Sequence, residues 1–276
     1  MPVDVLAHVI ANTHLSNDFS VLALSAPEIA AIAQPGQFVM IKTSAGIDPL
    51  LRRPFSIFEI LRDRSGTATG VSILNKRVGV GTTRLYAVRP GERLACLGPL
   101  CKPFSHVSPP AEAWIEAGGV GLAPFATLAE SLVQRGTVTT LFYGARRARE
   151  LFCTDRFERM GVRMALATED GSRGDTGLVT APLERALAAR TPDAAVHLYV
   201  CGPTPMMRAV ADLAHRFRRP CDVSLEQVMG CGMGGCYSCV VRTLTAAGKP
   251  HFVRSCLAGP VFDSRNVVWE ELGAGH

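Results

Sequence analysis

Short hydrophobic runs separated by turn residues fill the first 105 residues of the chain. Six of these runs are expected to be strands, at residues 8–10, 20–24, 38–41, 56–60, 71–74 and 93–97. Pro35-Gly36 and Pro90-Gly91 mark turns before the third and the sixth run. Short strands at this spacing predict a small antiparallel β-barrel.

From about residue 111 the pattern changes to strands that alternate with helical stretches. Strands are expected at 113–117, 139–143, 163–167 and 197–200, and helices at 124–135, 148–160, 182–189 and 205–217. Such alternation predicts a doubly wound parallel sheet covered by helices on both faces. The sequence therefore predicts a mixed β and α/β protein. Its expected parts are an antiparallel six-stranded barrel domain over 1–107, a parallel α/β domain over 108–222 and a small C-terminal domain over 223–276.

Four cysteines in the last quarter of the chain carry the most specific chemistry. Cys231, Cys236 and Cys239 are spaced C-x4-C-x2-C, and Cys256 follows on a distant segment. This is the plant-type ligand spacing of a 2Fe-2S cluster, and soft thiolate sulfur binds iron well. Glycines at 230, 232, 234 and 235 suit a loop that wraps closely around such a cluster. The sequence therefore predicts a one-electron carrier.

Other interpretations of the cysteines fit less well. Disulfides are disfavoured because the segment MPVDVLAHVI has no secretory signal, which predicts a cytoplasmic protein with reduced thiols. Zinc ribbons usually pair two C-x2-C knuckles, and only one short pair occurs here. Cys221 is an alternative fourth ligand, but the segment 251–256 returns after a turn at 247–250 and delivers Cys256. The remaining cysteines are expected to be small buried side chains: Cys96, Cys101, Cys153, Cys201 and Cys221.

Composition and charge exclude some classes of partner. The chain is 47% hydrophobic and 19% charged, as in ordinary globular proteins, and no run approaches the ~20 apolar residues of a membrane helix. The net charge is +5, the basic residues are scattered, and aromatic residues make up 7%. A nucleic-acid surface needs a concentrated basic stripe with stacking aromatics. We therefore expect neither a membrane span nor a nucleic-acid partner.

Two short motifs in the barrel region predict a flavin dinucleotide site. In RPFS, Arg53 offers a guanidinium to a pyrophosphate, Phe55 an apolar ring to the isoalloxazine, and Ser56 a hydroxyl to a ring nitrogen. An ordinary strand start explains this run by itself equally well. Further along, GVGTT precedes a helical stretch, where backbone N–H groups and a capping Thr82 favour an anion. The two motifs together favour FAD.

The α/β region carries glycine-containing motifs at the ends of two strands. GGVGLAP, residues 118–124, lies between a strand and a helix, where the backbone and the helix dipole can approach a pyrophosphate. It is not a full G-x-G-x-x-G fingerprint, and a tight strand–helix turn is the alternative. CGP, residues 201–203, ends the fourth strand at its carboxyl end. Cys201 there suits a contact with a nicotinamide, with a buried thiol as the alternative.

In this order the motifs resemble those of the ferredoxin-reductase-like flavoproteins. RPFS, GVGTT, GGVGLAP, CGP and the four cysteines follow one another as in that family. The C-terminal cysteine segment narrows the resemblance to the electron-transfer subunits of dihydroorotate dehydrogenase B. The strings at 167–172 and 256–262 are also similar to those subunits. One departure is Cys101, which stands where many of these proteins have glycine.

The resemblance implies a set of residues for each cofactor. FAD is expected on Arg53, Pro54, Phe55, Ser56, Leu74, Asn75, Lys76, Gly81 and Thr82. NAD is expected on Gly118, Gly119, Val120, Gly121, Pro124, Cys201, Gly202 and Pro203. The cluster ligands are expected to be Cys231, Cys236, Cys239 and Cys256, and Ser56 and Cys201 are the expected catalytic residues.

The resemblance further implies a function within a complex. A separate FMN-containing dihydroorotate dehydrogenase subunit oxidises dihydroorotate in pyrimidine biosynthesis, and electrons pass through the 2Fe-2S cluster to FAD and as hydride to NAD+. Two copies of each subunit are expected in a heterotetramer. Alternatives are a subunit of a sulfhydrogenase or a bifurcating transhydrogenase, and a zinc-stapled binding module. Arginines at 146, 147 and 149 leave NADP open, with a solvated turn as the other interpretation.

Overall fold

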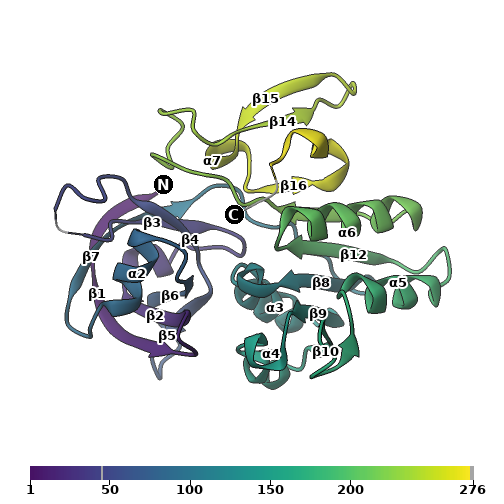
Figure 1. Cartoon of the computed structure of the whole chain (residues 1–276), viewed down its shortest axis with the longest axis horizontal. Coiled ribbons are helices and arrows are strands. Elements are labelled where there is room, and N and C mark those ends of the chain that lie inside the picture. Colours follow the sequence, from purple (N-terminus) through teal and green to yellow (C-terminus); the bar gives the residue numbers. More distant parts are fainter. Residues whose placement is uncertain (45, 274–276) are drawn as a thin grey trace. The chain divides into compact units, whose positions relative to one another are not determined.

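The chain forms two compact units in the computed structural model, which describes residues 1–44 and 46–273 (Figure 1). The first unit contains residues 1–103 together with 227–240 and 254–260. The second contains residues 104–226, 241–253 and 261–273. The C-terminal cysteine segment therefore contributes residues to both units.

The first unit is built on a curled antiparallel sheet of seven strands, in the order β4-β3-β7-β1-β2-β6-β5 (Figure 1). The strands are β1 (Val3–His14), β2 (Phe19–Ser25), β3 (Phe38–Ile41), β4 (Arg53–Ser56), β5 (Glu59–Arg62), β6 (Ala68–Lys76) and β7 (Arg93–Leu100). Two helices accompany them, α1 (Pro27–Ala30) and α2 (Val80–Ala87). The predicted antiparallel barrel is confirmed.

The number of strands in the barrel differs from the prediction of six. The single strand expected at 56–60 is wrong, because this stretch contains the end of β4 and the beginning of β5. Ile57 and Phe58, between the two strands, are fully buried. The Phe58 N–H already donates to Ser72 O of β6, so the chain leaves β3 and joins β6 at this point. At these two buried residues the chain passes from one edge strand of the sheet, β4, to the other, β5.

The second unit is a sheet of seven strands in the order β11-β10-β9-β8-β12-β13-β16. Its strands are β8 (Glu112–Gly118), β9 (Thr139–Ala145), β10 (Arg163–Thr168), β11 (Asp175–Thr176), β12 (Val196–Cys201), β13 (Cys221–Ser224) and β16 (Val261–Asp263). All pairs are parallel except β13 with β16. The order reverses between β8 and β12, which is the switch point at which such sheets bind ligands. The predicted doubly wound parallel sheet is confirmed.

Helices cover this sheet and bury its apolar side chains. They are α3 (Phe125–Gln134), α4 (Thr154–Arg159), α5 (Thr180–Ala188) and α6 (Thr204–Arg216). Leu183 of α5 and Val210 of α6 join Trp114 and Phe142 of the sheet in one buried cluster. The helix expected at 148–160 is shorter, because Cys153 takes a left-handed backbone (φ 58°) between the 3-10 turn η2 (Ala148–Glu150) and α4.

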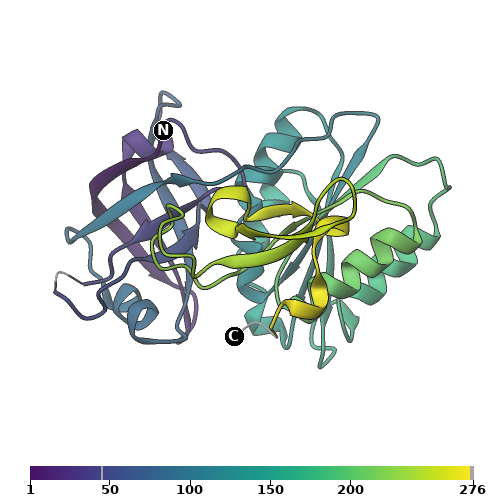
Figure 2. The ribbon, with the colours of Figure 1, turned by 90° about the horizontal axis from the view of Figure 1, so that it is seen from above.

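The cysteine segment continues from β13 into a loop and a hairpin (Figure 2). The hairpin pairs β14 (Val240–Leu244) with β15 (Pro250–Arg254) and turns at Gly248, whose φ is 73°. The chain then enters α7 (Ser255–Ala258), which carries Cys256. The return segment predicted from the sequence is therefore present. No helix in the described residues is long and apolar enough to cross a membrane.

Candidate functional site

The four cysteines singled out in the sequence come together on the first unit in two pairs. Cys231, Cys236 and Cys239 lie in the loop between β13 and β14, and Cys256 lies in α7. The thiols of Cys231 and Cys236 are hydrogen-bonded, and so are those of Cys239 and Cys256. The backbone N–H of Cys256 also donates to Cys239 Sγ at 3.4 Å. The cysteine alternative to Cys256, Cys221, lies on β13 in the second unit, where it bonds Ser264.

Hydrogen bonds from the loop converge on the outer pair, Cys231 and Cys236. The backbone N–H groups of Met233 and Gly235 each donate to Cys231 Sγ at 3.3 Å. Ser238 Oγ lies 3.1 Å from Cys236 Sγ. Hydrogen bonds from the side chain and backbone of Ser238 lower the pKa of Cys236 to about 6. The thiolate, which is the form that binds metal, therefore predominates at this cysteine at neutral pH.

The loop takes its shape from backbone conformations that favour glycine. Gly232 and Gly234 have φ values of 73° and 83°, in the left-handed region. A Cβ at Gly232 would lie 2.6 Å from Met40 Cγ, and one at Gly234 would lie 2.6 Å from Leu257 Cδ1. The glycines therefore let the loop lie directly on strand β3 and on α7.

The inner pair, Cys239 and Cys256, is enclosed by apolar side chains of the barrel. Both cysteines are at most 2% exposed. They form one buried cluster with residues of β3, β7 and the loop, namely Phe38, Met40, Leu97, Leu100 and Met229. Burial, with the neighbouring Cys239 thiol, raises the pKa of Cys256 to about 12. The cysteine group thus has one solvent-facing side and one side packed on the face of β3 and β7 that is turned away from the barrel core.

The residues present fit a 2Fe-2S cluster. Among the described residues, no three His, Cys, Asp or Glu side chains gather around a single ion position. Two pairs of thiols are instead what four ligands of a two-iron cluster require. The N–H groups that point at Cys231 and Cys239 supply the hydrogen bonds that stabilise charged sulfur.

The barrel gathers a second set of predicted residues around the N-terminus of α2. A Cβ at Gly81 would lie 3.4 Å from both Arg53 Cγ and Thr43 Oγ1. Thr82 Oγ1 accepts from the N–H groups of Val78 and Gly79, so the predicted capping role of Thr82 is present. Sequence reasoning missed Thr43, because it belongs to neither RPFS nor GVGTT.

Unpartnered polar atoms mark this region as a ligand site. Thr43 Oγ1 and Asn75 Oδ1 are buried and have no hydrogen-bond partner among the described residues. Buried polar atoms in native proteins nearly always have a partner, so a polar ligand is the expected one here. A cleft of about 620 Å³ includes Thr43 and is also lined by Lys42, Arg84 and Arg93, three basic side chains against the one acidic side chain of Glu92, a balance that favours an anion. The residues present fit FAD.

The other residues expected at the flavin differ in how they face this region. The side-chain amide of Asn75 donates to Thr82 O at 3.1 Å and so braces α2. Lys76 Nζ instead lies over the Phe19 ring, 5.7 Å from its centroid, and Leu74 is buried. The run Arg53–Ser56 forms the half-buried edge strand β4, in which Ser56 pairs with Phe38 of β3.

In the second unit the two glycine motifs meet at the switch point between β8 and β12. A Cβ at Gly121 would overlap the carbonyl of Cys201, and one at Gly118 would lie 2.7 Å from Met206 Sδ in α6. Gly119 has a φ of 55° and open space where its Cβ would be. The backbone there is accessible to a ligand, as the predicted pyrophosphate contact requires. The residues present fit NAD.

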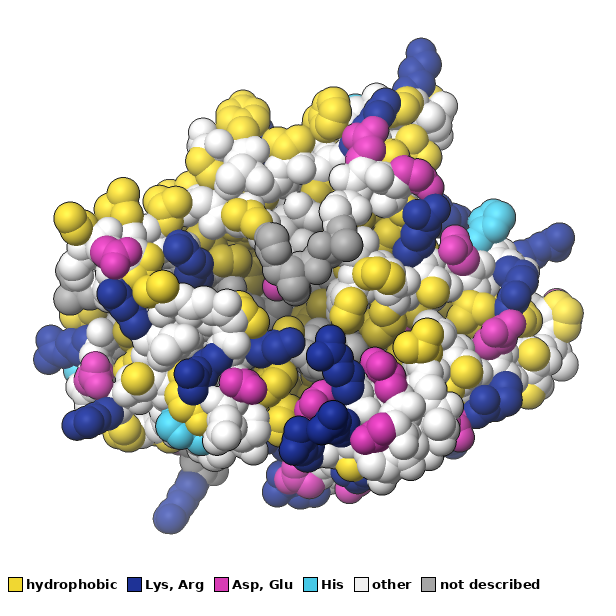
Figure 3. Space-filling view, viewed as in Figure 1, with side chains coloured by type: hydrophobic (Ala, Val, Ile, Leu, Met, Phe, Trp, Pro, Cys, Tyr) yellow, Lys and Arg dark blue, Asp and Glu magenta, His cyan; other side chains and the backbone are white. Residues whose placement is uncertain are grey.

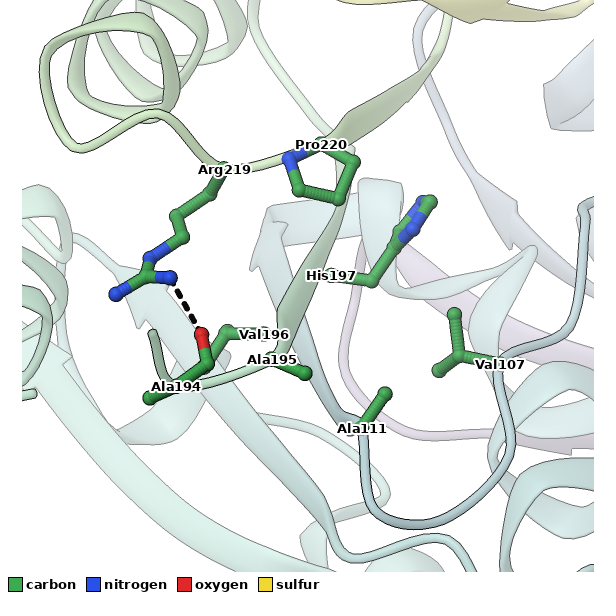
Figure 4. A pocket seen from close by; sticks show the side chains of 8 residues that line it. All are labelled: Val107, Ala111, Ala194, Ala195, Val196, His197, Arg219 and Pro220. Atoms are coloured by element: carbon green, nitrogen blue, oxygen red, sulfur yellow. Dashed lines mark hydrogen bonds between the residues drawn. The ribbon is translucent and has the colours of Figure 1, made fainter. Parts of the chain in front are cut away.

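The Cys201 thiol is less accessible than its position at the strand end suggests. It bonds Ser224, and burial raises its pKa to about 12. Its contact with a nicotinamide therefore stays a prediction. A separate cavity of about 210 Å³ lies at the amino ends of β12 and β13, between Val107, His197 and Arg219 (Figure 4). The loops 118–124 and 201–203 lie at the other ends of the strands, the carboxyl ends.

The buried carboxyl of Glu116 was not anticipated from the sequence. Glu116 lies on β8, two residues before Gly118, and is 1% exposed. Neither of its carboxylate oxygens has a hydrogen-bond partner among the described residues. Burial raises its pKa well above the usual value, so the side chain is held in the neutral form.

Comparison with known proteins assigns the family. The chain is 38% identical over 249 residues to the dihydroorotate dehydrogenase B (NAD(+)), electron transfer subunit of Desulforamulus reducens, a match that covers 90% of this chain and 92% of the relative. The chain belongs to the family of these electron transfer subunits. The resemblance seen in the sequence motifs is therefore confirmed.

Family models and solved structures agree with this family. Residues 117–212 match the oxidoreductase NAD-binding domain, and residues 226–268 match the iron-sulfur cluster binding domain of dihydroorotate dehydrogenase B. The NADH-dependent reduced ferredoxin-NADP oxidoreductase, studied for flavin-based electron bifurcation, is similar in structure. It has a TM-score of 0.82 at 27% identity, covering 97% of this chain and 91% of that one. A Neisseria gonorrhoeae ferredoxin NADP+ reductase with bound FAD and NADP shares the fold, with a TM-score of 0.63 at 18% identity, covering 78% of this chain and 91% of that one.

Proposed function

We propose that this chain transfers electrons from a partner catalytic subunit to NAD+, as the electron-transfer subunit of a dihydroorotate dehydrogenase B. The observation that carries the proposal is the packing of two cysteine pairs against the same barrel that presents the flavin residues. When bound, a 2Fe-2S cluster exchanges single electrons, and a flavin exchanges either single electrons or a hydride. The chain can therefore connect a one-electron route to the two-electron acceptor NAD+.

In this function the two cysteine pairs have different tasks. Cys239 and Cys256 would anchor the cluster against the outer face of β3 and β7, where apolar side chains exclude water. Cys231 and Cys236 hold its outer side, where the N–H groups of Met233 and Gly235 offset the charge on Cys231. The thiolate at Cys236 favours cluster assembly at neutral pH.

The residues around α2 bind and orient FAD. Arg53 and the N-terminus of α2 favour the pyrophosphate, and Thr43 Oγ1 offers an unused polar atom beside them. Ser56, at the end of β4, supplies a hydroxyl to a ring nitrogen of the isoalloxazine. In the second unit, Gly118–Pro124 and Cys201–Pro203 bind the dinucleotide acceptor through backbone groups.

The acceptor is NAD rather than NADP. Arg146 and Arg147 follow β9, at the position where a 2′-phosphate would lie. Asp170 lies beside them: its N–H donates to Arg146 O, and its carboxylate, which accepts from Ser172, interacts electrostatically with Arg147. A carboxylate at this place offsets the arginine charge and repels a phosphate. Titration with NADH and NADPH tests the choice, and equal reduction of the flavin by both would contradict it.

The partner is an FMN-containing dihydroorotate dehydrogenase subunit, in a cytoplasmic heterotetramer with two copies of each chain. Hydrophobic side chains reach the surface over the C-terminal cysteine segment, at the top of Figure 3. Beside the outer cysteines, Met233 and Tyr237 are 60% and 64% exposed, and Leu257 is 47% exposed. Exposed apolar side chains around an electron-transfer group are suited to a partner surface.

The decisive experiment is anaerobic purification of the chain alone and with its partner. Iron, sulfide and flavin analysis should give a 2Fe-2S cluster and one FAD, and NADH should reduce the flavin. With the partner present, dihydroorotate should reduce NAD+. A preparation without flavin or iron would contradict the proposal at its root. A loaded chain that co-purifies with a different catalytic subunit would instead select a bifurcating complex, to which the architecture is also similar.

A further inference from the structure

Cys101 is a fifth cysteine at the cluster site, and none of the roles above uses it. It follows directly after β7 and takes a left-handed backbone, with φ 73°. A residue with a Cβ is strained in this region and glycine is not, so backbone geometry alone would favour glycine at this position. The chain keeps a thiol there nevertheless, packed against the buried cluster that contains Cys239 and Cys256.

The thiol of Cys101 holds the turn that carries a cluster ligand. Its Sγ donates to the carbonyl of Cys256 at 2.8 Å and lies 3.8 Å from that of Ser255. The next N–H along, that of Lys102, donates to Gly259 O at 2.9 Å. The end of β7 is therefore joined at two points to the segment 255–259, and one of these points is a side chain.

The same residue is connected to the strand expected to face the flavin. The Ile57 N–H, next to Ser56, donates to Gln37 O at 3.0 Å. The Gln37 side-chain amide in turn donates to Cys101 O at 2.8 Å. Together with the Cys101–Cys256 bond, these contacts form a continuous route of three hydrogen bonds within the first unit. Electron tunnelling is faster along bonded and hydrogen-bonded routes than through empty space.

We propose that Cys101 is a positioning residue of the cluster site, which fixes the backbone of Cys256 and completes the hydrogen-bonded route to that ligand from Ile57, the residue after β4. This inference rests on the proposed function. Removing the thiol leaves all four ligands in place but loosens Cys256 and interrupts the route. The cluster should then be harder to reduce, and electrons that NADH supplies to the flavin as hydride should reach it more slowly.

Three substitutions separate the effect of losing the S–H donor from the effect of the strained left-handed backbone. Cys101→Ser keeps an O–H donor, Cys101→Ala loses the donor and keeps the backbone strain, and Cys101→Gly loses the donor and relieves the strain. Cys153 provides the matched control, since it is another half-buried cysteine with a left-handed backbone (φ 58°) but lies in the second unit. Cys153→Ser and Cys153→Ala should leave all cluster properties unchanged.

The measurements use the anaerobically purified chain without partner. Iron and sulfide are determined first, then the reduction equilibrium of the cluster by spectroscopic titration, then single-turnover reduction by NADH. For Cys101→Ala and Cys101→Gly we expect a three- to tenfold shift of the cluster toward the oxidised form, where tenfold corresponds to about 59 mV for one electron. Cluster reduction should slow severalfold while flavin reduction keeps its rate. Cys101→Ser should recover most of both properties.

Each outcome decides the proposal. Loss of iron from Cys101→Ala and Cys101→Gly, with retention in Cys101→Ser, would also support it, because the donor would then be needed to hold Cys256. Identical behaviour of all three variants, whether unchanged or all without iron, overturns it. A wild-type protein without cluster or flavin would be a different result, since it would refute the proposed function itself.

Discussion

Two kinds of loop are suited to bind their ligands through different groups. The cysteine loop carries Cys231, Cys236 and Cys239, and the glycine loops are residues 118–124 and 201–203. In the cysteine loop, side chains make the contacts, and glycines such as Gly232 and Gly234 only let the backbone approach the barrel and α7. In the glycine loops of the second unit the backbone is the proposed binding group, and a Cβ at Gly118 or Gly121 would clash with Met206 or with the Cys201 carbonyl. The first kind of site depends on the identity of four residues, whereas the second depends on the absence of a Cβ.

The largest expected effect is the loss of a ligand in the cysteine loop. Cys236→Ser should abolish electron flow from the partner, because the outer cysteine pair is broken. Reduction of FAD by NADH should remain largely intact, since Cys236 lies outside the α2 region and the glycine loops. Stopped-flow absorbance of the two reactions measures both effects in one preparation. Equal loss of both reactions would refute the proposed order of carriers.

A methyl group in the glycine loops should give the opposite result. In Gly121→Ala the added Cβ overlaps the Cys201 carbonyl, so the 118–124 and 201–203 loops must separate. We expect NADH affinity to fall at least about tenfold, the equivalent of ~1.4 kcal/mol, while iron content stays at the wild-type level. The dependence of the flavin reduction rate on NADH concentration measures the affinity.

The matched control for this change is Gly235→Ala. Its Cβ would meet no atom within 4 Å. NADH binding as weak in this control as in Gly121→Ala would show that the contact with Cys201 is not the cause.

Within the cysteine loop, close backbone approach matters at Gly232, where the loop lies on the barrel, as well as at Gly234. Gly232→Ala would place a Cβ 2.6 Å from Met40 Cγ at a φ of 73°. The left-handed backbone alone costs roughly 1–2 kcal/mol with a side chain present. We therefore expect reduced cluster occupancy and a lower melting temperature, measured by iron analysis and calorimetry. Gly235→Ala should match the wild type in both, and a deficit in both variants would remove the distinction.

The smallest expected effect concerns Glu116, the buried residue of β8 that lies two residues before Gly118. Because the pKa of Glu116 is raised in the folded state, its neutral form contributes stability that is complete below the unfolded pKa of ~4.3. This contribution is lost as the pH rises toward the folded pKa, so the free energy of unfolding should fall with increasing pH. Glu116→Val should be more stable by about 1–3 kcal/mol at pH 8, since no unpaired polar group remains buried.

Glu116→Gln separates two effects of the buried carboxyl group on stability, its titration and its lack of a hydrogen-bond partner among the described residues. It keeps a polar group but removes the titration, so it should lose the pH dependence and gain less stability than the valine variant. Denaturant unfolding at pH 5 and pH 8 measures the difference. A wild type with the same pH dependence as the glutamine variant would show that Glu116 is not the group responsible.

Sequence reasoning succeeded where a residue type has a single strong use. The spacing of Cys231, Cys236, Cys239 and Cys256 predicts a 2Fe-2S site, because cysteines at these intervals are the plant-type ligands of that cluster. The alternation of strands and helices in the same way implies a doubly wound sheet. Both inferences depend mainly on residue type and spacing. The doubly wound sheet is present in the structure, and the structure brings the four cysteines together.

What the sequence concealed depends on contacts between distant segments. Thr43 and Arg53 both lie beside Gly81 only in the folded chain, and nothing in the sequence around Thr43 marks it. The run 56–60 has the composition of one strand, yet tertiary burial of Ile57 and Phe58 divides it. Cys101 was visible as a departure from glycine, but its bond to Cys256 could be found only in three dimensions.

The solvent-facing sulfur of Cys236 has a practical consequence for anyone who handles the protein. Oxygen and peroxide attack accessible thiolates first, so oxidation should begin at Cys236 and reach the buried Cys239 and Cys256 later. We expect the isolated chain to lose the colour of its cluster in air. A catalytic subunit bound over the loop would protect Cys236 from oxidation as well as donate electrons.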